Sequence, residues 1–228
     1  MKRIRIAVLL AMGGLVSACA APTVPGKSAP FEATPLSSTS APAEQATQGT
    51  TDAAPLTDVH VKAITITVPR SLTVSEANRY IPKGDIVWRG DPIGDRHAQV
   101  AAIFDTAITR GAQSVQGAVP VALDIEVARF HALTEKARYS VGGVHNISFD
   151  LTLRDPATGA ALAETRQVQA DLDGFGGQQA INADARGQTQ KVRITAHLAE
   201  VIRQELTTAE GFANPRLGFI QAMNNQQK

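Results

Sequence analysis

The sequence is poor in several features that would indicate a specific class of protein. Only one of its 228 residues is cysteine, only 4% are aromatic, and there is a single tryptophan. One cysteine cannot form an internal disulfide, and so few aromatic side chains argue against a surface on which nucleic-acid bases stack. The formal net charge of +1 also gives no basic surface for non-specific nucleic-acid binding.

The apolar run at the amino terminus is too short to span a membrane. It covers residues 6–16 and follows Lys2, Arg3 and Arg5, whereas a spanning helix needs about 20 apolar residues. A short apolar run behind a positively charged start is typical of an export signal. Without residues 1–18, 19 basic side chains remain against 21 acidic ones, so the exported protein is expected to be weakly acidic.

The apolar run ends in Val16, Ser17, Ala18 and Cys19, which is the only cysteine. The small side chains at positions 17 and 18 fit the recognition pocket of a signal peptidase. These four residues resemble the lipobox of bacterial lipoproteins, in which the cysteine is diacylated and becomes the first residue after cleavage. Val16 stands where Leu is commoner. The resemblance implies a lipoprotein signal peptide over residues 1–18; an ordinary signal peptide is the alternative.

We predict that the protein binds a membrane through acylated Cys19. Each buried methylene of an acyl chain contributes about 0.8 kcal/mol, and two or more chains anchor a protein stably. Ala20, rather than Asp, follows the cysteine. By resemblance to Gram-negative lipoproteins, this implies the outer membrane and its periplasmic face, with the inner membrane as the alternative.

The rest of the chain divides into a linker, a domain and a tail. Residues 19–57 contain six of the twelve prolines and few large apolar side chains, so a disordered Ala/Pro/Ser/Thr-rich linker is expected behind the lipidated cysteine. Residues 58–210 carry regular apolar patterns and should form one globular domain. Residues 211–228 end in Asn and Gln, and we expect them to fray, with docking on the core as the alternative.

Apolar periodicity predicts both helices and strands in the domain. Helical spacing predicts one helix that begins at about Pro92 or Asp95 and ends at Ser114, and another over Lys191–Thr208. Alternating or β-branched patterns predict strands over 59–68, with a bulge near Ala63, and over 86–88, 121–133, 146–153 and 162–172. The strands are polar on one face, which predicts an α+β fold. We expect an antiparallel sheet of about four strands with two helices packed on one face, in the order β-α-β-β-β-α.

The segment from Tyr80 to Arg96 is the strongest candidate for contact with a partner. It is irregular, contains several glycines and prolines, and holds Tyr80, Trp88, Arg89 and Arg96. Exposed Trp, Tyr and Arg side chains often carry the binding energy of an interface. We predict that they contact an envelope protein or a glycan. The alternative is that Trp88 and Ile86 fill the sheet edge and the charges pair locally.

Evidence for catalysis or for a cofactor is weak. The five histidines lie singly, without the spacing of a metal site. The glycine-rich segment 173–177 lacks the Lys-Ser/Thr of a phosphate-binding loop. Asp124 and Glu126 share a strand face and could act as a general acid and base, but on a half-exposed sheet such a pair is normally a solvated face with cross-strand charge partners such as Arg166. We expect no cofactor, no metal and no nucleic-acid partner.

The chain resembles an uncharacterised family of small alphaproteobacterial lipoproteins, a domain of unknown function. The resemblance covers Ile66–Leu206 and includes the stretch IPKGDIVWRGD from Ile81 to Asp91. It implies no catalytic residue. The element order is also similar to that of auxiliary lipoproteins of envelope transport and assembly systems, although a fold does not fix a function. We therefore hypothesise a non-enzymatic binding module; the alternatives are an envelope hydrolase with an unrecognised carboxylate site and a carrier of an apolar ligand.

Overall fold

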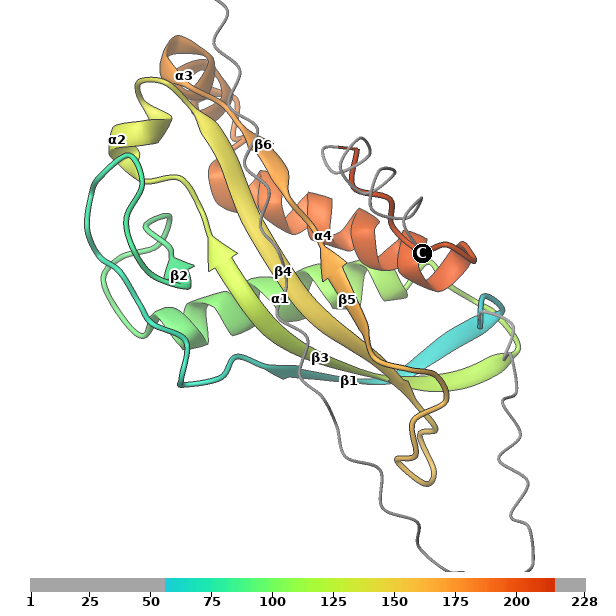
Figure 1. Cartoon of the computed structure of the whole chain (residues 1–228). Coiled ribbons are helices and arrows are strands. Elements are labelled where there is room, and N and C mark those ends of the chain that lie inside the picture. Colours follow the sequence, from blue (N-terminus) through green and yellow to red (C-terminus); the bar gives the residue numbers. More distant parts are fainter. Residues whose placement is uncertain (1–55, 216–228) are drawn as a thin grey trace, which may run out of the picture. The chain divides into compact units, whose positions relative to one another are not determined.

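Six strands form one mixed sheet in the computed structural model, which describes residues 56–215 (Figure 1). β1 pairs with β3 in parallel, and β3–β4 and β4–β5 are antiparallel, so the main strand order is β1-β3-β4-β5. The short β2 pairs with the end of β3, and β6 pairs with the start of β4. In chain order the elements are β1 (Val59–Thr67), β2 (Ile86–Val87), α1 (Arg96–Ala112), β3 (Val119–His131), α2 (Glu135–Arg138), β4 (Gly143–Arg154), β5 (Arg166–Gln169), β6 (Leu172–Gly174), α3 (Gly177–Ala185) and α4 (Gln190–Thr207).

The α+β class is confirmed, but the expected antiparallel sheet is wrong for two strand pairs. β1 and β3 run in the same direction because α1 crosses over between them, as parallel neighbours require. β2 also pairs with β3 in parallel. The sequence patterns do not predict α2 and α3, since α2 has four residues and α3 buries only Ala180 and Ala183.

The two predicted helices are confirmed: α4 agrees to within one residue at each end, and α1 begins one residue after Asp95, the later of its two predicted starts, and ends two residues before Ser114. Asp95 caps α1 by accepting a hydrogen bond from the Ala98 amide, and Thr189 caps α4 in the same way. The predicted bulge in β1 is also present, as a register shift between Val61 and Ala63. Local sequence signals therefore place these elements correctly.

Edge-to-face aromatic contacts fill the space between the helices and the sheet. Trp88 lies 5.6 Å from Phe130, Phe130 lies 6.1 Å from Phe104, and Phe104 lies 5.5 Å from Phe149, measured between ring centroids. All four side chains are fully buried. Such pairs contribute about 0.5–1.5 kcal/mol each beyond the burial of their area. They join β2, β3, β4 and α1 into one core.

The first residues after α4 dock on the domain. The Phe212 ring packs edge-to-face on His197 at 5.7 Å, and Asn214 Nδ2 donates to the Gln169 carbonyl at 3.1 Å. Residues 211–215 therefore cover the end of β5 rather than fray. The predicted signal peptide, Cys19 with Val16, Ser17 and Ala18, the linker up to residue 55, and residues 216–228 lie outside the described residues.

Candidate functional site

Trp88 lies in the core, in agreement with the alternative given for its segment, and not at a contact surface. Its side chain is fully buried, its ring packs on Phe130, and its indole Nε1 donates a hydrogen bond to Asp91 Oδ2 at 2.8 Å. The residue follows β2 directly and closes the sheet edge beside it. Trp88 is therefore not available to a partner in this structure.

Local ion pairs hold the two arginines of the predicted contact segment. Arg96 is 4% exposed, and its Nε donates to Glu76 Oε1 at 2.6 Å. This hydrogen bond lowers the pKa of the Glu76 carboxyl. Arg89 is partly buried and donates from Nε to Glu135 Oε2 at 2.5 Å. Arg89 and Arg96 therefore hold the segment before α1 to Glu135 and Glu76, which indicates that they stabilise the position of this segment.

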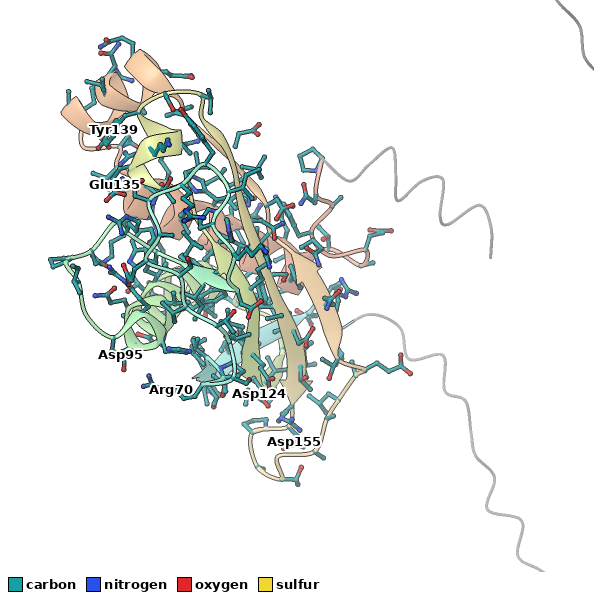
Figure 2. All side chains as sticks on the ribbon, turned by 60° about the vertical axis from the view of Figure 1, so that its left-hand side comes forward. Arg70, Asp95, Asp124, Glu135, Tyr139 and Asp155 are labelled. Carbon is teal, nitrogen blue, oxygen red and sulfur yellow. The ribbon has the colours of Figure 1, made fainter. Side chains whose placement is uncertain are left out.

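Tyr80 alone among the four predicted contact residues lines an open hollow. It lies on one side of a groove of about 550 Å³ at the end of β3. The side chain of the next residue, Ile81, is 86% exposed, and that of Val141 on the facing loop is 76% exposed. In Figure 2, Tyr139 and Glu135 mark this end of the molecule, while Asp124 and Asp155 mark the opposite end.

We call this hollow the apolar groove, with Tyr80 and Ile81 as its first lip and Val141 as its second lip. Its lining is mostly apolar, and its polar side chains come from β3 and β4. We call its buried lining residues, Ala132, Leu133 and Ala137, the groove floor; Val144, Arg129 and Asn146 also line the groove. Exposed apolar side chains around a concave surface are typical of a binding site.

Hydrogen bonds on both sides of the first lip hold it in place. Thr134 Oγ1 donates to the Arg79 carbonyl at 2.7 Å, and His131 Nε2 lies 3.0 Å from the Pro82 carbonyl. Arg79 and Pro82 directly flank the lip in the sequence. The lip is therefore anchored to the end of β3 and to the residue that caps α2. A preformed surface loses less conformational entropy when it binds.

The glycine-rich segment 173–177 supports the second lip. Gly142 has a φ of 74°, which favours glycine, and a Cβ there would lie 2.9 Å from the Gly176 amide nitrogen. A Cβ on Gly176 would meet the Gly142 nitrogen at 2.4 Å. These close backbone approaches press the loop that carries Val141 against β6 and the start of α3. These contacts explain why glycine is needed at positions 142 and 176, and an anion site is not required to account for it.

His145 lies beneath the groove floor. It is 1% exposed, and its Nδ1 accepts a hydrogen bond from the Leu133 amide at 3.2 Å. Burial, together with the nearby charges of Arg193 and Arg138, lowers the pKa of His145 to about 3. The imidazole is therefore neutral near pH 7 and supports the backbone of the floor.

The carboxylate pair of β3 belongs to the solvated face of the sheet. Arg154 Nε donates to Asp124 Oδ2 at 2.9 Å, and Glu126 is exposed. The suggested partner Arg166 is wrong, since its Nη1 lies 3.0 Å from Glu205 Oε2 instead. Arg154 reaches Asp124 because β4 lies beside β3, with Thr152 directly opposite Asp124.

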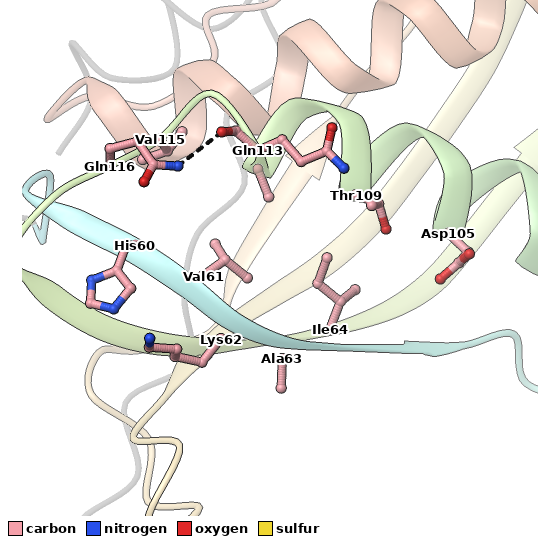
Figure 3. A pocket seen from close by; sticks show the side chains of 11 residues that line it. His60, Val61, Lys62, Ala63, Ile64, Asp105, Thr109, Gln113, Val115 and Gln116 are labelled. Atoms are coloured by element: carbon pink, nitrogen blue, oxygen red, sulfur yellow. Dashed lines mark hydrogen bonds between the residues drawn. The ribbon is translucent and has the colours of Figure 1, made fainter.

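A second hollow of about 600 Å³ lies between β1 and α1 (Figure 3). Polar side chains line much of it, including Lys62 on β1, Asp105 on α1 and Gln113 directly after α1. β1 is the outer strand of the sheet at this point. An exposed Lys and a bulge are devices that keep such an edge from pairing with other chains, so this hollow is the weaker candidate.

Residues 56–215 offer neither a metal site nor a membrane-spanning helix. No three His, Cys, Asp or Glu side chains in this part of the chain lie close enough to share a metal ion. No helix of the same residues is both long and apolar enough to cross a bilayer. The apolar groove is therefore the main candidate site that the described residues offer.

The sequence identifies Tyr80 as a candidate contact residue but does not single out Ile81 or Val141. Both are aliphatic residues in turn-rich sequence: Ile81 precedes Pro82, and Val141 precedes Gly142 and Gly143. An aliphatic residue beside Pro or Gly and outside any apolar period is the signal that could have identified them. Their meeting at one groove depends on the tertiary structure.

Three solved structures show a weak likeness to the chain. A candidate lipoprotein from Caulobacter crescentus CB15 has 18% identity and a TM-score of 0.34, covering 68% of this chain and 90% of the other. A Xanthomonas campestris protein of the DUF330 family has 14% identity and a TM-score of 0.36, covering 78% and 93%. The dodecamer of a PelC variant from Paraburkholderia phytofirmans has 12% identity and a TM-score of 0.31, covering 68% and 90%. TM-scores of this size establish neither a common fold nor a common function.

The match to a protein family is more extensive. No curated protein sequence matches the chain. The model of one family, however, matches residues 59–222, from the first strand into the carboxyl-terminal tail. This range is more than half of the chain and includes both lips of the apolar groove. The chain therefore belongs to DUF6778, a family of unknown function.

Proposed function

We propose that the protein is a lipid-anchored lipoprotein of the cell envelope that faces the periplasm and binds a protein partner without catalysing a reaction. An auxiliary role in an envelope transport or assembly system is part of this proposal. The observation that carries it is the apolar groove with the exposed side chains of Ile81 and Val141. Covering such side chains contributes about 25 cal/mol per Å² of apolar surface, which favours a partner there.

The position of the groove supports a tethered binding module. The described chain enters the domain at residue 56, and Val59 pairs with Val119 at the start of β3. The groove lies near His131, at the other end of β3. Twelve residues of extended strand correspond to about 40 Å. A domain held through a linker before residue 56 would therefore present the groove at the end away from its attachment.

The anchor is tested by substituting the predicted acylated residue. Cys19→Ala should leave the signal peptide uncleaved by the lipoprotein peptidase and abolish incorporation of a labelled fatty acid. The matched control is Ser17→Ala, which keeps a small residue in the recognition pocket and should be processed normally. Normal cleavage of the Cys19→Ala protein, or acyl label retained on it, would contradict lipidation at this residue.

The binding site is tested by placing a photo-crosslinking amino acid at position 81 in growing cells. Position 93 provides the matched control, because Ile93 is 90% exposed and does not line the groove. We expect one discrete adduct, identified by mass spectrometry, from position 81 and none of that size from position 93. A probe at position 141 should give the same adduct, and combining this probe with the substitution Ile81→Asp should abolish the adduct. Equal labelling from positions 81 and 93 would exclude the groove as the contact site.

A further inference from the structure

The first lip of the apolar groove is surrounded by uncompensated positive charge. Arg79 and Lys83 lie on either side of it in the sequence, and both residues are exposed. The exposed Lys136 places its Nζ 4.8 Å from the centroid of the Tyr80 ring. None of these three cations has an ion-pair partner among residues 56–215.

The carboxylates of the same region are already engaged. Asp85 Oδ2 accepts hydrogen bonds from the Thr73 hydroxyl at 2.7 Å and from the Thr73 amide at 2.9 Å, which lowers the pKa of Asp85. Arg129 faces the same carboxylate at 3.8 Å. Glu135 pairs with Arg89. Because these negative charges are compensated within the domain, the rim of the groove keeps a net positive charge.

We infer that the groove binds an apolar peptide segment flanked by acidic residues. Its apolar side chains would lie between the two lips, and its carboxylates would face Arg79, Lys83 and Lys136. The inference rests on the proposed function, since the groove must first be a binding surface. Apolar burial supplies most of the affinity at such an interface, whereas complementary charge selects the partner and speeds its association.

The shape of the site favours a peptide over a lipid surface. The floor residues Leu133 and Ala137 lie below the lips and are 9% and 2% exposed. A bilayer surface would meet Ile81 and Val141 but would not reach this floor. A side chain inserted between the lips would reach it. The volume of about 550 Å³ is also within the range of sites that hold several side chains or a small ligand.

The test uses the acylated full-length protein in detergent micelles and a displayed library of random twelve-residue peptides. We expect the selected peptides to combine aliphatic or aromatic residues with at least two Asp or Glu residues. The combined variant Arg79→Glu, Lys83→Glu and Lys136→Glu should weaken the best peptide about 10-fold and shift new selections toward basic peptides. The matched control Lys62→Glu, Arg110→Glu and Arg186→Glu makes the same charge change at exposed residues outside the groove; it should leave binding unchanged.

The outcomes separate this inference from the proposed function. If Ile81→Asp abolishes peptide binding while reversal of the rim charges has no effect, the groove is a binding site and the acidic preference is wrong. If Ile81→Asp also has no effect, the groove is not the binding site. A fluorophore at position 81, but not at 93, that is quenched by brominated lipid in vesicles with 30% phosphatidylglycerol would show membrane docking and overturn the inference.

Discussion

The indole Nε1 of Trp88 donates a hydrogen bond to Asp91 Oδ2 at 2.8 Å inside the domain. The other oxygen of this carboxylate lies 2.8 Å from Lys191 Nζ at the start of α4. Partial burial alone would raise the pKa of Asp91, but the hydrogen bonds from Lys191 and Trp88 hold it below its ordinary value. Asp91 therefore joins the end of the β2 segment to α4.

Replacing Asp91 should destabilise the fold through Trp88. Asp91→Ala leaves a buried indole N–H without its acceptor, so the free energy of unfolding should fall by about 1–3 kcal/mol. Asp91→Asn keeps an acceptor oxygen and should cost less. Urea unfolding followed by the fluorescence of Trp88, the single tryptophan, measures both. An Asp91→Ala protein as stable as the parent would show that the bond contributes nothing net.

Arg96 should affect stability and not partner binding. Arg96→Ala removes the pair with Glu76 and the hydrogen bonds to two backbone carbonyls before α1, with an expected cost of about 1–3 kcal/mol. Arg70→Ala is the matched control, because the Arg70 side chain is 71% exposed in its pair with Asp95, and solvent screens such an exposed pair, so its removal should change stability little. Thermal unfolding and crosslinking from position 81 are measured on both. If Arg96→Ala abolished crosslinking without lowering stability, Arg96 would have to contact the partner directly.

Gly111 should not tolerate a methyl group. A Cβ there would lie 2.2 Å from Ile202 Cγ2 and 2.3 Å from the Ala199 carbonyl oxygen, where α1 crosses α4. Although Ala is favoured over Gly within a helix by about 1 kcal/mol, overpacking costs about 1–3 kcal/mol, so Gly111→Ala should reduce stability. At Gly94 a Cβ would approach the end of the Gln99 side chain at 3.1 Å, and Gly94→Ala serves as the control. A rise in melting temperature for Gly111→Ala would refute the close packing of these helices.

Stability should fall as the pH drops below about 6.5. Burial lowers the pKa of His145 to about 3, whereas an unfolded histidine titrates near 6.5. The unfolded chain therefore binds a proton that the folded chain excludes, and stability is full above 6.5 and lost toward 3. The free energy of unfolding should therefore fall by about 2 kcal/mol between pH 7 and pH 5, because it falls by about 1.36 kcal/mol for each pH unit below 6.5. Burial lowers the pKa of His197 as well, which acts in the same direction.

The variant His145→Gln separates this effect from general acid sensitivity. Its free energy of unfolding is compared with that of the parent at pH 7, 6 and 5. We expect a lower value at pH 7, because the Leu133 amide loses its histidine partner, and a flatter dependence on pH, so that the difference from the parent becomes smaller toward pH 5. Carboxylates with lowered pKa, such as Asp95 at about 2, lose their stabilising effect only at lower pH. An unchanged slope between pH 7 and pH 5 would exclude His145 as its source.

Local sequence patterns correctly predict those structural features that depend only on residues close together in the chain. The apolar stripes of α1 and α4, the inward residues of β3 and the bulge near Ala63 all follow from the period of helix or strand. Strand direction does not, and β1 runs parallel to β3 because α1 crosses between them. The burial of Trp88 depends on Phe130, which lies about 40 residues further along the chain.

Residues close together in the chain are enough to predict the α+β class, the helices α1 and α4 to within a few residues, and an acylated Cys19. The two lips of the groove cannot be predicted in this way, because Tyr80 and Ile81 lie about 60 residues from Val141 in the sequence and meet only in the folded domain. The burial of Trp88 and Arg96 likewise depends on the folded domain. The physical reason is that burial and concave surfaces arise where distant segments pack together, and no local period records which segments will meet.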